Sequence, residues 1–250
     1  MYGRGFAQVY NKLWVEFVTL VAPRIREYYE ERPLSKTNKL ILDLCCGTGQ
    51  LAVHFLENGY QVLGIDLSEE MLSWARKNTA QYLETGSVEF QKGDVTDFTL
   101  EPQFGLIVST FDSFNHLENF ADLEKCLLCA YRALVEDGLL IFDLNTRKGL
   151  LRWNEIFIQD TEEAMIVTRG IYDGQSDKAW TRISGFVQTP NGTYERFSET
   201  LFNTVFELEK VKKCLLAIGW RDVHFALGPE LQTAIETPEK ERRVFCIARK

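Results

Sequence analysis

The chain has 250 residues, of which 45% are hydrophobic, and its formal net charge is −8 at pH 7. This length and apolar content are sufficient for the core of one α/β domain with an insertion. The acidic balance disfavours a nucleic-acid substrate, because an acidic surface repels phosphate backbones. The nearest basic group, Lys240 with Arg242 and Arg243, is interrupted by Glu239 and Glu241, and this pattern predicts a solvated face.

No basic-then-apolar leader precedes the first helical pattern, and no run approaches the roughly 20 apolar residues that span a membrane. We therefore expect a cytoplasmic protein, a monomer or homodimer, without membrane contact. Its six cysteines should be reduced thiols. Cys126 and Cys129 share one face of a predicted helix. Because no second pair accompanies them, buried small hydrophobes explain them better than a redox or zinc site.

The first part of the chain has helical apolar spacing over residues 6–31, where Pro23 predicts a kink. Strands and helices alternate from residue 40 onward. Strands are predicted at 40–44, 61–65, 88–91, 104–109 and 139–144, and helices at 50–58, 68–82 and 119–135. Ser68 is predicted to cap the second of these helices. The alternation is typical of an α/β fold with a mostly parallel, doubly wound sheet.

The pattern changes after Asn145. Segments 165–172, 180–188 and 193–205 alternate apolar and polar residues and are separated by the turn signals Asp-Gly and Asn-Gly. They predict a three-stranded antiparallel insertion. A helix at 207–217 with Gly219 as its C-cap and strands at 220–226 and 244–248 then follow. These two strands bring the predicted main sheet to seven.

The glycine loop after the first strand is the most informative segment. Gly47 and Gly49 allow a tight turn and a close approach to a ligand. The loop lies at the carboxyl end of its strand, where open α/β sheets bind nucleotides. The second strand ends at Asp66, and Asp94 follows the third. The pattern therefore predicts an adenosine pocket, with a ribose acceptor at Asp66 and an adenine acceptor at Asp94.

The loop alone leaves a second class of enzyme open. Residues 47–52 fit the G-x-G-x-x-A form of the dinucleotide fingerprint, and Asp66 lies near the expected offset of about 20 residues. A nicotinamide-dependent oxidoreductase is therefore the alternative. Asp43 before the loop and Asp94 after the third strand favour a different class.

Asp43 and the sequence Cys46-Gly47-Thr48-Gly49 resemble the first motif, D-x-G/A-C-G-T-G, of the class I S-adenosylmethionine-dependent methyltransferases. Cys45 stands where that motif has a smaller residue. The resemblance implies a Rossmann-like, seven-stranded methyltransferase sheet and S-adenosylmethionine as the cofactor. It also leaves open a non-catalytic subunit that only binds S-adenosylmethionine.

Three further segments resemble the small-molecule group related to the glycine and amino-sugar N-methyltransferases. They are the N-terminal segment up to Leu13, the loop 111–117 and the closing strand 242–248, so the resemblance covers nearly the whole chain. Asn11 departs from the usual Asp, and residues 201–204 lack the histidine and arginine often present there. The resemblance implies methyl transfer to an N or O atom of a small molecule.

The resemblance also implies roles within one domain, 1–250. Residues 1–32 would form a helical lid, and 160–205 would cover the substrate site. Asp43 would accept from the amino group of the cofactor, Asp66 from its ribose hydroxyls, and Asp94, with the Val95 N–H, would bind adenine. The other implied cofactor-binding positions are Tyr10, Cys45, Gly47, Gly49, Leu67, Met71 and Phe111.

Candidate catalytic residues lie in the loop 111–117. Methyl transfer is an in-line displacement, for which alignment and desolvation supply much of the rate. A general base is needed only if the acceptor arrives protonated. His116 could be that base or could shape the substrate pocket. Asp112 could hold the loop or a substrate ammonium, and the Asn115 amide could orient a polar acceptor. Asp112, Asp143 and Asn145 could mimic a magnesium site, but no other feature supports one, so we expect no metal.

Overall fold

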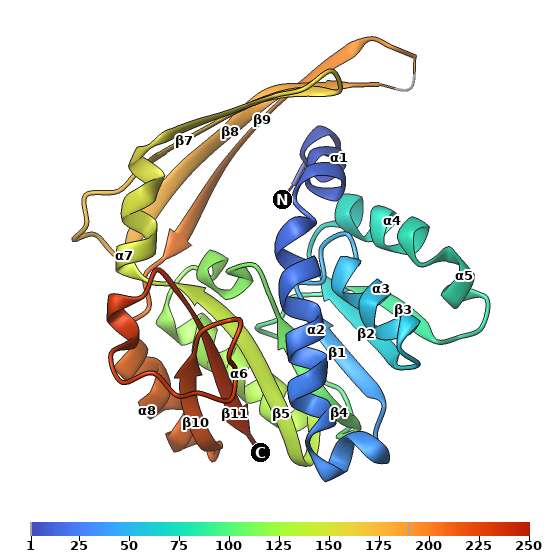
Figure 1. Ribbon diagram of the computed structural model, residues 1–250, viewed down its shortest axis with the longest axis vertical. Helices are drawn as coiled ribbons and strands as arrows, with labels where there is room; N and C mark the ends of the chain where they lie inside the picture. The colour runs from blue at the N-terminus through green and yellow to red at the C-terminus, as the bar shows by residue number, and fades with distance from the viewer. Residues whose placement is uncertain (1, 190) are drawn as a thin grey trace.

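The computed structural model describes residues 2–189 and 191–250, so the parts of the expected lid and insertion at Met1 and Pro190 lie outside the description. The chain forms a seven-stranded sheet of order β10-β11-β5-β4-β1-β2-β3 and a four-stranded sheet of order β6-β7-β8-β9. Figure 1 shows the smaller sheet standing beyond one end of the larger sheet.

The larger sheet confirms the predicted doubly wound fold. Its strands are β1 (Leu40–Leu44), β2 (Gln61–Asp66), β3 (Val88–Lys92), β4 (Phe104–Ser109), β5 (Leu134–Asn145), β10 (Arg221–Ala226) and β11 (Arg243–Arg249). β1 to β5 pair in parallel, and β11 runs antiparallel between β5 and β10. Every residue of β4 is buried, as expected for a central parallel strand covered on both faces.

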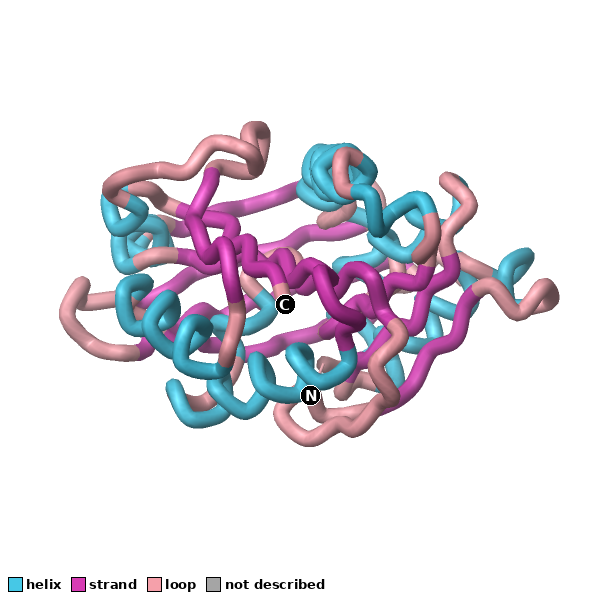
Figure 2. Tube along the Cα trace, turned by 90° about the horizontal axis from the view of Figure 1, so that it is seen from below, coloured by secondary structure: helices cyan, strands magenta, loops and turns pink. Residues whose placement is uncertain are grey.

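Helices cover both faces of this sheet, as Figure 2 shows in the view from below. One apolar core joins the sheet to α2 (Glu16–Glu30), α3 (Gln50–Glu57) and α4 (Glu69–Asn78), and the other joins it to α6 (Phe120–Ala133) and α8 (Leu208–Ile218). The remaining helical elements are α1 (Arg4–Leu13), α5 (Ala80–Leu83), α7 (Arg147–Leu150), η1 (Pro33–Lys36), η2 (Ser113–His116), η3 (Leu151–Asn154) and η4 (Pro238–Lys240).

The break in the N-terminal helical segment lies at Trp14, not at Pro23. Pro23 sits inside α2 and does not end it, so a kink at Pro23 stays a prediction. Trp14 ends α1 with φ −115° and ψ 32°, outside the helical region. The two helices serve different surfaces, because α2 packs on the larger sheet while α1 contacts α4 and β9. Two predicted helix caps are confirmed. The Ser68 hydroxyl accepts from the Met71 N–H, and Gly219 caps the C-terminus of α8 at φ +118°.

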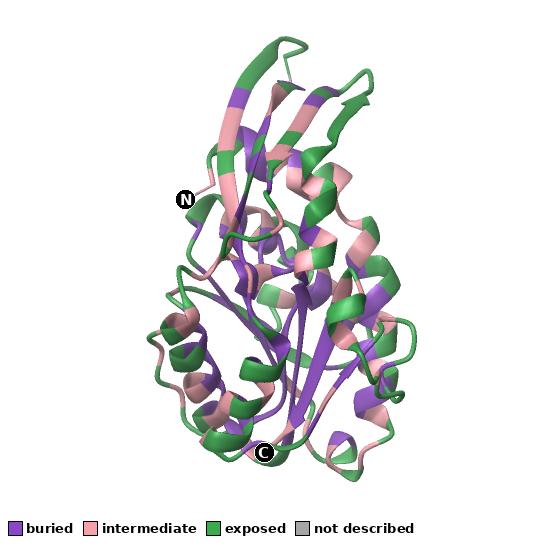
Figure 3. Ribbon diagram, turned by 90° about the vertical axis from the view of Figure 1, so that its left-hand side faces the viewer, coloured by how far each residue is buried: buried purple, intermediate pink, exposed green. Residues whose placement is uncertain are grey.

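The smaller sheet has one strand more than the pattern predicted. Its strands are β6 (Ile156–Asp160), β7 (Ala164–Ile171), β8 (Lys178–Gln188) and β9 (Tyr194–Thr204). β6 escaped prediction because Ile156, Phe157 and Ile158 form a short apolar run without alternation, and all three are exposed. Figure 3 shows the contrast between the buried strands of the larger sheet and the mixed exposure of the smaller one.

The cysteines and the lengths of the helices were two subjects of the sequence-based expectations. All six cysteines are free thiols. Cys126 of α6 is fully buried in the core, in agreement with a packing role, and Cys129 on the same helix is partly buried. Among residues 2–189 and 191–250, no helix is both long enough and apolar enough to cross a membrane.

Candidate active site

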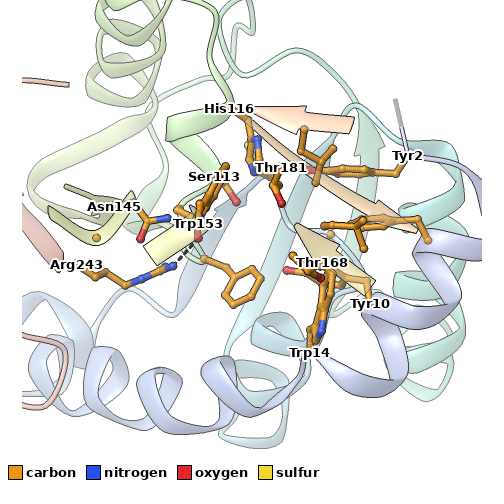
Figure 4. A pocket seen from close by; sticks show the side chains of 18 of the residues that line it. Tyr2, Tyr10, Trp14, Ser113, His116, Asn145, Trp153, Thr168, Thr181 and Arg243 are labelled. Carbon is orange, nitrogen blue, oxygen red and sulfur yellow. Dashed lines mark hydrogen bonds and ion pairs between the residues drawn. The ribbon is translucent and has the colours of Figure 1, made fainter. Parts of the chain in front are cut away.

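A cavity of about 540 Å³ lies between the larger sheet, α1 and the smaller sheet. Its floor is formed by the loops that follow β1, β2, β4 and β5, all at the carboxyl ends of parallel strands. Its walls are α1, the segment 149–157 and the inner face of β7, β8 and β9. Figure 4 shows side chains from these separate elements converging on the same space. This is the position at which open α/β sheets bind ligands.

The glycine loop and β2 together fix one carboxylate at the cavity. Gly47 has φ +55°, and its N–H donates to Asp66 Oδ2 at 2.9 Å, while the Ser68 N–H donates to Asp66 Oδ1 at 2.8 Å. Burial raises the pKa of Asp66, and these two N–H donors oppose the increase. Each oxygen of a carboxylate has two acceptor positions. Asp66, which lines the cavity, can therefore accept from two further donors such as vicinal hydroxyls.

Asp43, at the end of β1, is a buried acceptor without a partner. Its side chain is only 2% exposed, and Oδ2 has no hydrogen-bond partner among the described residues. Burial, together with the nearby Asp66 charge, raises the pKa of Asp43 well above its ordinary value. A cation or N–H donor arriving from the cavity, directly or through a water, would compensate for both effects. Asp43 does not itself line the cavity, so its contact with the amino group of the cofactor stays a prediction.

α1 presents a row of aromatic side chains to the cavity. Tyr2, Phe6, Tyr10 and Trp14 are spaced four residues apart and all line it. Neighbouring rings in this row lie 4.6 to 6.3 Å apart, and the Tyr10 ring meets the Phe111 ring edge-on at 5.7 Å. Trp14 has the helical spacing of a packing residue, but it also lines the cavity and therefore forms part of its wall. Aromatic faces attract cations such as a sulfonium.

The predicted cofactor positions divide into two sets. Tyr10, Cys45, Gly47, Asp66, Leu67, Met71, Val95 and Phe111 line the cavity. Asp43, Gly49 and Asp94 are not among the lining residues. Gly49 instead begins α3 at φ +78°, where an added Cβ would lie 3.0 Å from the Ala75 side chain. Its absent side chain therefore serves helix packing, and a contact of the Gly49 backbone with the cofactor stays a prediction.

Asp94 is exposed beside the cavity. Its Oδ1 accepts from both the backbone N–H and the hydroxyl of Thr96 at 2.8 Å. The next residue, Val95, lines the cavity. One carboxylate oxygen of Asp94 is therefore left for an adenine amine, and that role stays a prediction.

The loop after β4 presents Asp112, Ser113 and His116 to the cavity. The His116 ring meets Phe202 edge-on at 6.4 Å. Within the described residues, neither ring nitrogen of His116 has a hydrogen-bond partner. A general base is commonly oriented by a third group. The surroundings of His116 therefore favour the pocket-shaping role over the role of base.

Asn115 has a different role from the one expected. Its side chain is fully buried and does not line the cavity. Its Nδ2 donates to the carbonyls of Asn145 and Thr204, at 3.2 and 2.9 Å, and its Oδ1 accepts from the Asn145 N–H at 2.9 Å. Because the side chain is buried and both of its N–H groups are used, the amide holds the loop against β5 and β9. The expectation that it orients a substrate is wrong.

Arg243, at the start of β11, lies between two carboxylates. Its guanidinium forms ion pairs with Asp112 Oδ1, at 2.6 Å, and with Asp143 Oδ2. The dashed line in Figure 4 marks the pair that Arg243 forms within the cavity wall. Arg243 thus belongs to the cavity and not to a solvated face, which corrects that expectation. The guanidinium also holds two of the three groups considered as a magnesium site, and the described residues contain no cluster of metal-binding side chains.

Asp143 gives a pH-dependent prediction. Burial raises its pKa from 3.8 to about 6, although Arg243 pulls it in the opposite direction. Between these two values the folded chain binds a proton that the unfolded chain does not, so the contribution of this carboxyl to stability falls as the pH rises. We expect the free energy of unfolding of the wild type, relative to Asp143→Asn, to fall by about 2 kcal/mol from pH 4 to 6. Urea unfolding of both proteins at several pH values measures this difference in the free energy of unfolding. A difference that does not change with pH would contradict the prediction.

The lining residues that the sequence did not single out come from the insertion, from the segment 149–157 and from the N-terminal residues around α1. Thr181 and Ile183 alternate along β8 on its inner face, and Thr168 and Leu201 face the cavity from β7 and β9. The period-2 pattern identified these strands but not which of their faces covers the site. Arg152 and Trp153, from η3, carried no recognisable signal.

Comparisons with known proteins point to one class. Residues 41–138 match a family model described as a methyltransferase domain. A putative methyltransferase of Geobacillus sp. strain WCH70 is 28% identical over 98% of both chains. The dTDP-3-amino-3,4,6-trideoxy-alpha-D-glucopyranose N,N-dimethyltransferase of Streptomyces venezuelae is 24% identical over 76% of this chain and 78% of its own. A crystal structure of an S-adenosylmethionine-dependent methyltransferase from Clostridium acetobutylicum superposes with TM-score 0.79 at 24% identity, covering 98% and 97%.

Proposed function

We propose that this chain, a class I S-adenosylmethionine-dependent methyltransferase, methylates an amine nitrogen of a small molecule. The observation that carries the proposal is the single cavity that joins Asp66 and the glycine loop to Asp112, Ser113 and His116. When bound, S-adenosylmethionine supplies an activated methyl group on a sulfonium. The protein's part is then to bind, align and desolvate the acceptor. The Streptomyces venezuelae relative is named as an N,N-dimethyltransferase, and this supports nitrogen over oxygen as the methyl acceptor.

The acidic side chains around the cavity support an amine acceptor. Asp112 is 7% exposed, and only one of its oxygens is paired with Arg243. Its other oxygen can accept from a substrate N–H. The same proposal includes a cytoplasmic monomer or homodimer that contacts neither nucleic acid nor membrane. It also includes residues 1–32 as a lid and the insertion 160–205 as a cover of the substrate site.

A labelled-methyl assay tests this function. The isolated chain is incubated with methyl-labelled S-adenosylmethionine and a panel of small amines, each paired with the analogue that has a hydroxyl in place of the amine. We expect label on nitrogen in at least one pair and little on the hydroxyl analogue. Transfer only to oxygen would contradict the choice of nitrogen. Stoichiometric binding of S-adenosylmethionine without transfer to any member would favour a non-catalytic subunit.

Two arginines suggest a further property of the acceptor. Arg152 and Arg242 line the cavity, and among residues 2–189 and 191–250 neither guanidinium has a hydrogen-bond or ion-pair partner. Asp66 and Asp112 also line the cavity, but Asp112 is paired with Arg243, and Glu155 is the acidic lining residue nearest to Arg152 in the sequence. Arg152, Arg242 and Glu155 together carry a net positive charge. An acceptor that carries a phosphate or carboxylate away from its amine would complement it.

Arg152→Ala and Arg242→Ala should each raise the KM of an anionic acceptor about tenfold, the usual consequence of losing a charge-assisted hydrogen bond. The KM of a neutral analogue should not change. Arg169→Ala is the matched control, because Arg169 is exposed in β7 next to the inward-facing Thr168. Equal effects on anionic and neutral acceptors would contradict this recognition.

A further inference from the structure

The loop after β4 contains two consecutive residues in a costly backbone conformation. Phe111 and Asp112 have φ of +67° and +49°, in the left-handed region that residues other than glycine seldom adopt. Each such residue costs on the order of 1 kcal/mol and persists only where its surroundings impose it. The conformation turns Asp112, Ser113 and His116 toward the cavity. The surroundings that hold it therefore determine the geometry of the acceptor site.

Three contacts at this turn involve Arg243 or its partner Asp143, in addition to the Asn115 amide described above and the Ser113 hydroxyl, which donates to the Thr110 carbonyl at 2.8 Å. The Asp112 N–H donates to Asp143 Oδ2 at 2.9 Å, and the Asp112 carboxylate accepts from Arg243 at 2.6 Å. Arg243 also donates to the Asp143 oxygen that binds the Asp112 N–H. A planar guanidinium suits this bridge, because its two N–H groups reach two acceptors in a fixed geometry. Removing one charge would leave a buried carboxylate unpaired.

The guanidinium also connects the loop to the N-terminal helices. Its carbon lies 4.7 Å from the centre of the Phe17 ring of α2 and 5.6 Å from that of Phe111. The Phe17 and Phe111 rings are 5.2 Å apart, and Phe111 contacts Tyr10 of α1. One side chain of β11 thus contacts the acceptor loop, Asp143 of β5 and, through the Phe17 ring, α2.

We propose that Arg243 is a positioning residue for methyl transfer: it holds the turn at Phe111 and Asp112 and thereby sets the acceptor loop against the aromatic wall of α1 and α2. The expected loss of rate rests on the proposed function. The expected loosening of the loop does not, because it can be measured without any acceptor.

The chain contains a matched control on the same strand. Arg249, at the other end of β11, also bridges two aspartates in the left-handed region, Asp137 and Asp222. These aspartates are exposed, and none of the three residues lines the cavity. Arg243→Lys and Arg249→Lys therefore make the same chemical change in two similar bridges, one at the site and one remote from it.

Hydrogen exchange of the free chain is the first measurement. In Arg243→Lys, amides of residues 110–117 should exchange about tenfold or more faster than in the wild type, since the loop loses its fixed bridge. Arg249→Lys should leave these amides unchanged. Wild-type exchange in Arg243→Lys, or an equal increase in both variants, would overturn the proposal whether or not an acceptor is known.

Kinetics with a working acceptor are the second measurement. Arg243→Lys should lower kcat about 10- to 100-fold, while the affinity for S-adenosylmethionine by calorimetry stays within about threefold, because misplacement by about an ångström has effects of this size on alignment. In Arg243→Ala, added guanidinium at millimolar concentration should restore part of kcat, and ammonium should not. A change confined to the melting temperature, or no rescue by guanidinium in a folded variant, would indicate a merely structural role.

Discussion

Asp66→Ala should weaken binding of S-adenosylmethionine by about 10- to 150-fold, which corresponds to the roughly 1.5–3 kcal/mol of hydrogen bonds to a charged acceptor. The carboxylate lines the cavity and is fixed by the Gly47 and Ser68 N–H groups, so its remaining acceptor positions face the cofactor without reorganisation. The substitution also leaves these two donors unpaired. The melting temperature should therefore be recorded beside the calorimetric affinity.

Glu69→Ala is the control for the change in charge. Glu69 lies three residues further along, and its exposed side chain pairs with Arg76 on the surface of α4. The Glu69→Ala variant should bind S-adenosylmethionine with the affinity of the wild type. Wild-type affinity in a folded Asp66→Ala would exclude the ribose assignment, and an equal loss in both variants would assign the effect to net charge.

His116→Asn should raise the acceptor KM about tenfold, with kcat changed by less than about threefold and the pH–rate profile kept. The reason is that His116 lines the cavity against Phe202, while none of the described groups orients its ring for proton transfer. Steady-state rates over pH 5.5–9 measure both constants. A loss of 10²- to 10⁴-fold in kcat, together with loss of the acidic limb of the profile, would instead establish His116 as the general base.

The parts of the site that the sequence predicted are those built from local patterns. The glycine loop, Asp43 and Asp66 lie at the ends of two neighbouring strands, and the order of parallel strands brings strand ends to one edge. Gly47 and Asp66 are only 19 residues apart in the chain, and their hydrogen bond follows from the pairing of β1 with β2. The period of the hydrophobic pattern likewise determined the strands and helices that position them.

The errors concern side chains whose partners are distant in the sequence. Asn115 was assigned to the substrate, but it binds Thr204, 89 residues further on. Arg243 was assigned to a solvated face, but its partners Asp143 and Asp112 precede it by 100 and 131 residues. The Arg243 contacts depend on the antiparallel pairing of β11 with β5, and the Asn115 contact depends on the placement of β9; no local pattern reveals either. The arrangement of the acceptor half of the cavity was therefore beyond prediction.

A crystal structure of the chain with S-adenosylhomocysteine would test the account most directly. We expect both ribose hydroxyls within hydrogen-bond distance of Asp66 and the amino group on the side of Asp43. The sulfur should face Asp112, Ser113 and His116 across the cavity. An adenosine bound away from Asp66, or a sulfur pointing away from the loop after β4, would contradict it.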